Sequence, residues 1–100
     1  MKTRTITYTV AALVDISAMQ AWLTQPGAAA RARRRMVRIL AAIDGLADHP
    51  CRFAVGSAGV CEFTCEGYRI VYRVLPDTGR DETAGDVQLL RLFGPGQLRM

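Results

Sequence analysis

The fold is decided by one stretch of sequence, Val60-Cys61-Glu62-Phe63-Thr64-Cys65-Glu66-Gly67-Tyr68-Arg69-Ile70-Val71-Tyr72-Arg73-Val74. Apolar and polar side chains alternate on both sides of Glu66-Gly67, as they do in strands with one buried face. Two residues are the length of a tight hairpin turn, in which Gly adopts a positive φ. This turn sets the expected cross-strand neighbours, which are apolar: Cys65 with Tyr68, Phe63 with Ile70, and Cys61 with Tyr72.

The other face of the predicted hairpin is polar and charged. Glu62 lies diagonally across from both Arg69 and Arg73, a spacing that favours cross-strand ion pairs. Arg91, in a later strand, adds a further positive charge. Two interpretations stay open at this point: the charges form a solvated network, or Arg73, Arg91 and Glu62 contact a target.

The rest of the chain predicts a strand, two helices and one more strand. Residues 4–10 alternate in the manner of a strand, and residues 87–93 are apolar on both faces, which suits a central strand. Residues 11–23 and 28–47 have apolar side chains at helical spacing. The order predicts a single α+β domain over residues 1–100, with an N-terminal strand, a two-helix hairpin and three antiparallel strands, and with the helices packed on one face of an antiparallel sheet.

Composition excludes several classes of protein. The 100 residues carry a formal net charge of +4, which favours an acidic partner, either a nucleic acid or an acidic protein segment. Apolar runs stay shorter than the ~18 residues of a membrane span, and residues 1–10 lack the apolar stretch of a signal peptide, so we expect a cytoplasmic protein without membrane contact. Cys61 and Cys65 lie ~13 Å apart along one strand, too far for one tetrahedral ion. We expect no metal and no cofactor.

The second predicted helix carries a run of arginines. Arg31, Arg34, Arg35 and Arg38 recur at helical spacing, which predicts one cationic stripe opposite the buried face. Either the stripe is a solvated face, or it binds an acidic protein segment or a nucleic acid. Trp22, near the end of the first helix, is either an interface anchor or a cap on the core.

Several segments, in this order along the chain, match a known family: Ala12-Leu13-Val14-Asp15-Ile16, Asp48-His49-Pro50, Gly67-Tyr68-Arg69-Ile70-Val71-Tyr72 and Leu89 to Phe93. With them, and with its alternating first strand, the chain resembles the RelE/ParE family of bacterial toxins from type II toxin–antitoxin modules. The Gly-Tyr-Arg segment is the most specific of these features.

The resemblance implies a cytoplasmic, growth-inhibiting toxin that serves plasmid stabilisation and is held inactive in a hetero-oligomer with its antitoxin. Its target is either ribosome-bound mRNA, which it cleaves, or DNA gyrase. In the mRNA-cleaving branch the arginine of the Gly-Tyr-Arg segment, here Arg69, stabilises phosphate charge. The predicted antitoxin-binding residues are Arg31, Arg34, Arg35, Arg38 and Trp22.

The residues leave open whether this chain is an enzyme. RNA cleavage by 2′-hydroxyl attack requires a base, a cation and an acid; Arg69 supplies charge, and Tyr72 is the candidate proton donor. Members that cleave mRNA usually carry lysines where this chain has Val60 and Glu62, and basic or aromatic side chains where it has Gly94-Pro95-Gly96-Gln97. The alternative to a toxin is a non-toxic binding module that keeps the fold and the antitoxin contact.

Overall fold

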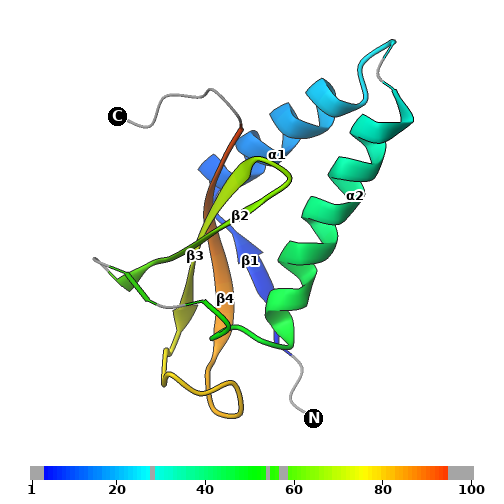
Figure 1. Cartoon of the computed structure of the whole chain (residues 1–100). Coiled ribbons are helices and arrows are strands. Elements are labelled where there is room, and N and C mark those ends of the chain that lie inside the picture. Colours follow the sequence, from blue (N-terminus) through cyan, green and yellow to red (C-terminus); the bar gives the residue numbers. More distant parts are fainter. Residues whose placement is uncertain (1–3, 28, 54, 57–58, 95–100) are drawn as a thin grey trace.

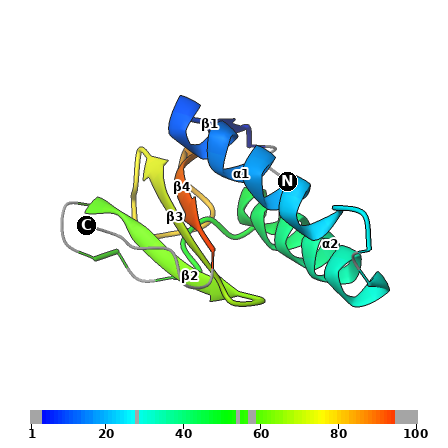
Figure 2. The same cartoon turned by 90° about the horizontal axis from the view of Figure 1, so that it is seen from above.

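Two helices cover one face of a four-stranded sheet. The computed structural model describes residues 4–27, 29–53, 55–56 and 59–94. Figure 1 and Figure 2 show the helices side by side on the same side of the sheet. The elements are, in chain order, β1 (Ile6–Tyr8), α1 (Val10–Leu23), α2 (Ala30–Asp44), the short 3-10 helix η1 (Gly45–Ala47), β2 (Cys61–Cys65), β3 (Tyr68–Leu75) and β4 (Asp86–Phe93).

The α+β class and the position of the helices are confirmed, but the sheet is mixed rather than antiparallel. Its strand order is β1-β4-β3-β2, so β4 is central, as its apolar sequence predicts. The later strands pair antiparallel, whereas β1 pairs parallel with β4. The reason is the helical hairpin, which returns the chain to the end of the sheet where β1 began (Figure 1). As a result β2 runs in the same direction as β1. Strand β3 then reverses and β4 reverses again, so β4 is also parallel to β1.

The predicted hairpin register is confirmed at every position. Cys61 pairs with Tyr72, and Cys65 pairs with Tyr68. Both turn residues have a positive φ, 53° at Glu66 and 82° at Gly67. This is the backbone of a type I′ turn, whose twist matches that of the strands it joins. This conformation costs free energy in a residue that has a Cβ, and at Glu66 a hydrogen bond from Arg35 to the backbone carbonyl supports it.

The first strand is shorter than predicted because Thr9 ends it and starts a helix. The Thr9 side chain accepts a hydrogen bond from the Ala12 N–H at 3.1 Å, as an N-cap does, and donates one to the Leu90 carbonyl at 2.9 Å. The strand therefore covers Ile6–Tyr8 instead of 4–10, and α1 begins one residue before the predicted start. The second helix starts at Ala30, after the N-cap residue Ala29, and its α-helical part ends at Asp44, three residues before the predicted end; the 3-10 helix η1 continues the chain to Ala47. Residue 28, the predicted start, lies outside the described residues.

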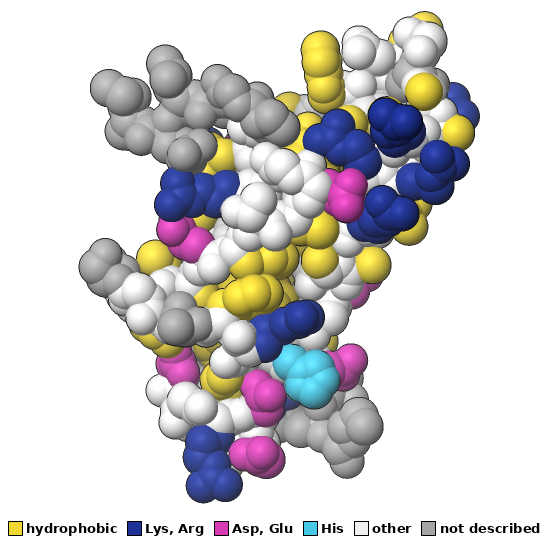
Figure 3. All heavy atoms as spheres, in the orientation of Figure 1, with side chains coloured by type: hydrophobic (Ala, Val, Ile, Leu, Met, Phe, Trp, Pro, Cys, Tyr) yellow, Lys and Arg dark blue, Asp and Glu magenta, His cyan; other side chains and the backbone are white. Residues whose placement is uncertain are grey.

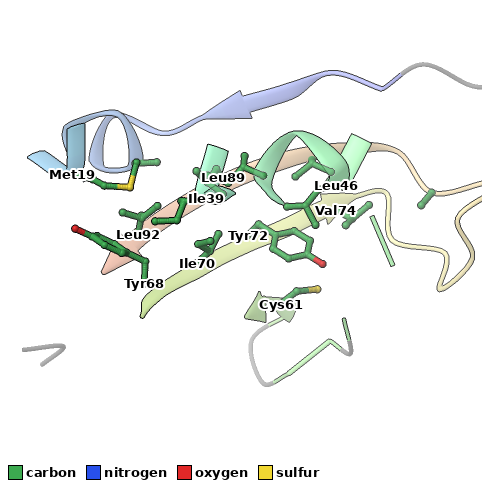
Figure 4. Close-up of a cluster of buried hydrophobic side chains, with 14 of the residues drawn as sticks. Met19, Ile39, Leu46, Cys61, Tyr68, Ile70, Tyr72, Val74, Leu89 and Leu92 are labelled. Carbon is green, nitrogen blue, oxygen red and sulfur yellow. The ribbon is translucent and has the colours of Figure 1, made fainter. Parts of the chain in front are cut away.

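The core lies between the helices and the side chains that β3 and β4 turn toward them. Figure 4 shows these side chains directed at α1, α2 and η1. Burial of apolar surface of this kind is the main favourable contribution to folding. The largest buried side chains in the described residues include Tyr72, Met19, Leu23, Ile39, Ile43, Leu46, Ile70, Leu89 and Leu92. No helix in this part of the chain has the length and apolar character needed to cross a membrane.

A buried arginine near the N-terminus, Arg4, connects the helical layer to the loop that precedes β4. Arg4 is 8% exposed, and its guanidinium donates to the carbonyl oxygens of Ala84 at 3.0 Å, Ala47 at 2.9 Å and Asp81. The Asp81 carboxylate accepts a hydrogen bond from the Cys51 N–H at 2.9 Å, which is the main reason that its pKa lies below the ordinary value. Segments far apart in sequence are thus joined at one guanidinium.

We expect Arg4→Met to lower the free energy of unfolding by about 1 to 3 kcal/mol, because it leaves buried carbonyl groups without their donor. Urea denaturation followed by circular dichroism measures this loss. The matched control is Arg80→Met, since Arg80 and its partner Glu82 are both largely exposed and such pairs contribute at most about 1 kcal/mol. Equal losses in the two variants would show that the Arg4 contacts contribute little.

Candidate functional site

The sheet face that the helices leave uncovered carries paired arginines. Arg69 donates to the Glu62 carboxylate at 2.8 Å, and both side chains are about two-fifths exposed. Arg73 donates instead to the Gln88 amide oxygen at 2.7 Å. The predicted diagonal pairing of Glu62 is therefore confirmed for Arg69 and wrong for Arg73, because β4 supplies a closer acceptor.

A shallow depression of about 430 Å³ lies beside the Arg69–Glu62 pair. Its lining also includes Phe63, Thr64 and Gly67. The carboxylate that would act as a base here already accepts a hydrogen bond from Arg69, which keeps it directed at the guanidinium. The geometry suits binding of a polar or anionic group better than proton transfer.

The third arginine of this face contacts helix α1. Arg91 donates to the Asp15 carboxylate at 2.7 and 3.3 Å and lies over the Phe93 ring, 4.6 Å from its centroid. The hydrogen bond to Asp15 raises the pKa of Arg91. Asp15 also accepts from the Leu92 N–H at 2.8 Å. Strand β1 ends at Tyr8 and leaves the edge of β4 unpaired from there on. The Asp15 carboxylate accepts the hydrogen bond of a backbone N–H at that edge in place of a neighbouring strand.

The predicted proton donor lies in the core. The Tyr72 side chain is 0% exposed, and its hydroxyl donates to the Pro50 carbonyl at 3.0 Å. Burial raises the pKa of this hydroxyl well above its usual range. The candidate catalytic role of Tyr72 therefore conflicts with its position, because a group without access to solvent cannot pass a proton to a bound target.

The arginines of α2 do not form one solvent-facing stripe. Arg35 is partly buried, donates to the Glu66 carbonyl at 2.7 Å, and lies 4.0 Å from its carboxylate. Arg38 lies 3.6 Å from the same carboxylate. Arg31 and Arg34 are exposed, as predicted. Figure 3 shows this basic group over α2 with an acidic side chain at its border.

A groove of about 490 Å³ lies between α1, α2 and the neighbouring ends of β3 and β4. Trp22 lines it and is 64% exposed, so its predicted alternative role as a core cap is wrong. Helix α1 is mostly apolar and also exposes Val10, Leu13 and Val14 to solvent. The groove residues are Asp15, Ala18, Met19, Trp22, Arg35, Tyr68 and Gly94.

Residues 6–92 match the family model described as the ParE toxin of the type II toxin–antitoxin system, parDE. The chain belongs to this family. It is also similar to a solved structure titled "Chromosomal ParDE TA system from P. aeruginosa", with 17% identity, a TM-score of 0.64, and coverage of 93% of this chain and 97% of that one. At this identity the likeness is one of fold. No curated protein sequence matches the chain.

Two residues of this ParE-family chain, Asp15 and Glu66, have contacts that the residue spacing does not predict. Asp15 lies within the Ala-Leu-x-Asp-Ile segment, and a lone acidic residue in an otherwise uncharged helix indicates a specific partner. Glu66 is predicted only as a turn residue. The sequence signal for Glu66 is an acidic residue in the hairpin turn of a chain whose second helix is rich in arginine; the contact itself depends on how the helix packs on the sheet.

We expect the Tyr72 hydroxyl to matter for folding rather than for catalysis. Tyr72→Phe should cost about 1 kcal/mol near neutral pH, because the Pro50 carbonyl loses its donor. A raised pKa in the folded state contributes stability that is complete below the ordinary value of 10.0 and is lost as the pH rises above it. The variant should therefore lose less stability than the wild type between about pH 9 and about pH 11.

Urea denaturation across that pH range measures the difference. Tyr8→Phe is the control, because Tyr8 is 36% exposed and burial raises its pKa as well. Above pH 9, the dependence of its free energy of unfolding on pH should differ less from that of the wild type than the dependence measured for Tyr72→Phe. An unchanged slope in Tyr72→Phe would contradict the burial argument.

Proposed function

We propose that this protein inhibits growth as the toxin of a type II toxin–antitoxin module, and that an antitoxin encoded beside it neutralises it in a hetero-oligomer. The family match over residues 6–92 supports the proposal. It is strengthened by the exposed apolar face of α1 and the arginines of α2, since a large apolar and charged surface on a small protein is typical of one that has a partner. The module acts in the cytoplasm, where it serves plasmid stabilisation.

The toxin acts by binding its target rather than by cutting RNA. The observation that carries this proposal is the pairing on the uncovered sheet face, where Glu62 is engaged by Arg69 and Tyr72 is buried beneath. Within the described residues that face offers charge for binding but no base free to accept a proton. The target that the family resemblance implies for such a member is DNA gyrase, with Arg73 and Arg91 beside Arg69 in the contact surface.

Cleavage of ribosome-bound mRNA is the second candidate. It is favoured by Arg69, which occupies the arginine position of the Gly-Tyr-Arg segment and is exposed enough to meet a phosphate. An incoming phosphate would have to draw Arg69 away from Glu62. Exposed ion pairs of this kind contribute only about 0.2 to 1 kcal/mol, so replacing Glu62 by a phosphate as the partner of Arg69 costs little free energy.

Induced expression of the wild-type chain should arrest growth, and co-expression of the neighbouring open reading frame should restore it. Colony counts after induction measure both effects. A matched strain expressing a frameshifted neighbour controls for the expression burden. Unimpaired growth of cells that express the chain alone would favour the non-toxic binding module over the toxin.

Transcripts should stay intact when the toxin is induced, and plasmid supercoiling should change. Primer extension on ribosome-bound transcripts and gel analysis of plasmid topoisomers test the two targets in the same cells. Arg69→Ala should weaken growth arrest at least as much as Arg73→Ala, because it empties the depression beside Glu62 of its cation. Cuts in phase with codons that vanish in Arg69→Ala would establish the nuclease instead.

A further inference from the structure

Glu66 is an acidic side chain set among the cations of α2. Its carboxylate lies 4.0 Å from the Arg35 guanidinium and 3.6 Å from that of Arg38. Arg31 and Arg34 lie on the same helix and remain exposed. One carboxylate thus faces a cluster with a clear excess of positive charge, and further negative charge is favourable there.

This contact adjoins the groove beside Trp22. Arg35 takes part in both, because it lines the groove and also binds Glu66. Ala18, Met19 and Trp22 supply an apolar wall from α1. The acidic residue in the lining, Asp15, already accepts from Arg91 and from the Leu92 N–H, so it does not oppose a second carboxylate strongly.

We propose that Glu66 stands in for a carboxylate of the antitoxin, which displaces it from Arg35 and Arg38 when an acidic, amphipathic segment of that partner docks in the groove. The inference rests on the proposed function, since it takes the antitoxin as the occupant. It adds an internal competitor, the Glu66 carboxylate, for the arginines that the partner binds. The apolar residues of the segment contact Met19 and Trp22, and its acidic residues contact the α2 arginines.

The chemistry of the groove favours a protein segment over a nucleic acid. An amphipathic helix or strand brings apolar and acidic side chains at a fixed spacing, which matches an apolar wall beside a cation. A second copy of this chain is a poor occupant, because it would bring its own arginines to the same place. Charge complementarity therefore selects an acidic partner.

Moving the Glu66 carboxylate away from Arg35 and Arg38 costs little free energy. The Glu66 side chain is 27% exposed and that of Arg38 is 63% exposed, so solvent screens much of their attraction. Before the partner arrives, the internal carboxylate offsets repulsion within the arginine cluster; afterwards, the partner does so.

The test measures the affinity of the purified product of the neighbouring open reading frame for four variants of the full chain. Glu66→Gln should bind it about two- to fivefold more tightly than the wild type, because the competitor is gone. Glu62→Gln is the matched control, since it removes the same charge from the uncovered sheet face and should leave the affinity nearly unchanged. Arg35→Gln should weaken binding about tenfold, whereas Arg33→Gln, off the groove, should have a much smaller effect.

Two readouts separate the location from the affinity. Calorimetry gives the dissociation constant, and the fluorescence of Trp22, the single tryptophan of the chain, reports whether the groove is covered. Thermal melting of each variant confirms that it folds. Tighter binding in Glu66→Gln with a shift in Trp22 emission supports the proposal.

The opposite outcomes are equally clear. Binding by the wild type that Glu66→Gln leaves unchanged, or changes only as much as Glu62→Gln does, would overturn the inference and leave the toxin–antitoxin function standing. Binding without any change in Trp22 emission would place the partner elsewhere and also overturn it. No binding to the wild type would remove the proposed antitoxin, and the inference with it.

Discussion

The register of the β2–β3 hairpin is the constraint on which the rest of the structure depends. A shift of one residue would turn every side chain of a strand to the other face of the sheet. The observed register places Ile70 and Tyr72 against the helices and Arg69 on the uncovered face. The two-residue turn at Glu66 and Gly67 holds that register, so the core and the charged surface follow from one local geometry.

The same turn links the sheet to the helical layer. Its backbone carbonyl and carboxylate both contact α2, through Arg35 and Arg38. Across the same groove, Asp15 of α1 accepts from the Leu92 N–H at the edge of β4. Polar contacts thus join the layers at their margins, while apolar packing joins them in the middle. This arrangement leaves the outer faces of α1 and α2 available, one apolar and the other basic.

Much of the fold was predictable from side-chain spacing. Strand alternation predicts the register of Cys61 with Tyr72, and the apolar sequence of residues 87–93 predicts the central strand. The direction of β1 was not predictable in this way, because the spacing of a strand is the same in parallel and antiparallel sheets. That direction depends on where the helical hairpin returns the chain.

The candidate site was predictable in its residue types and not in its contacts. The sequence by itself determined the faces of the strands, the spans of the helices and the presence of arginines on exposed positions, since these follow from local periodicity. Only the tertiary structure decided that Arg73 pairs with Gln88, that Arg91 pairs with Asp15, and that Tyr72 has no route to a target. The physical reason is that an ion pair or a buried hydroxyl depends on distances between elements, and packing of the helices against the sheet sets those distances.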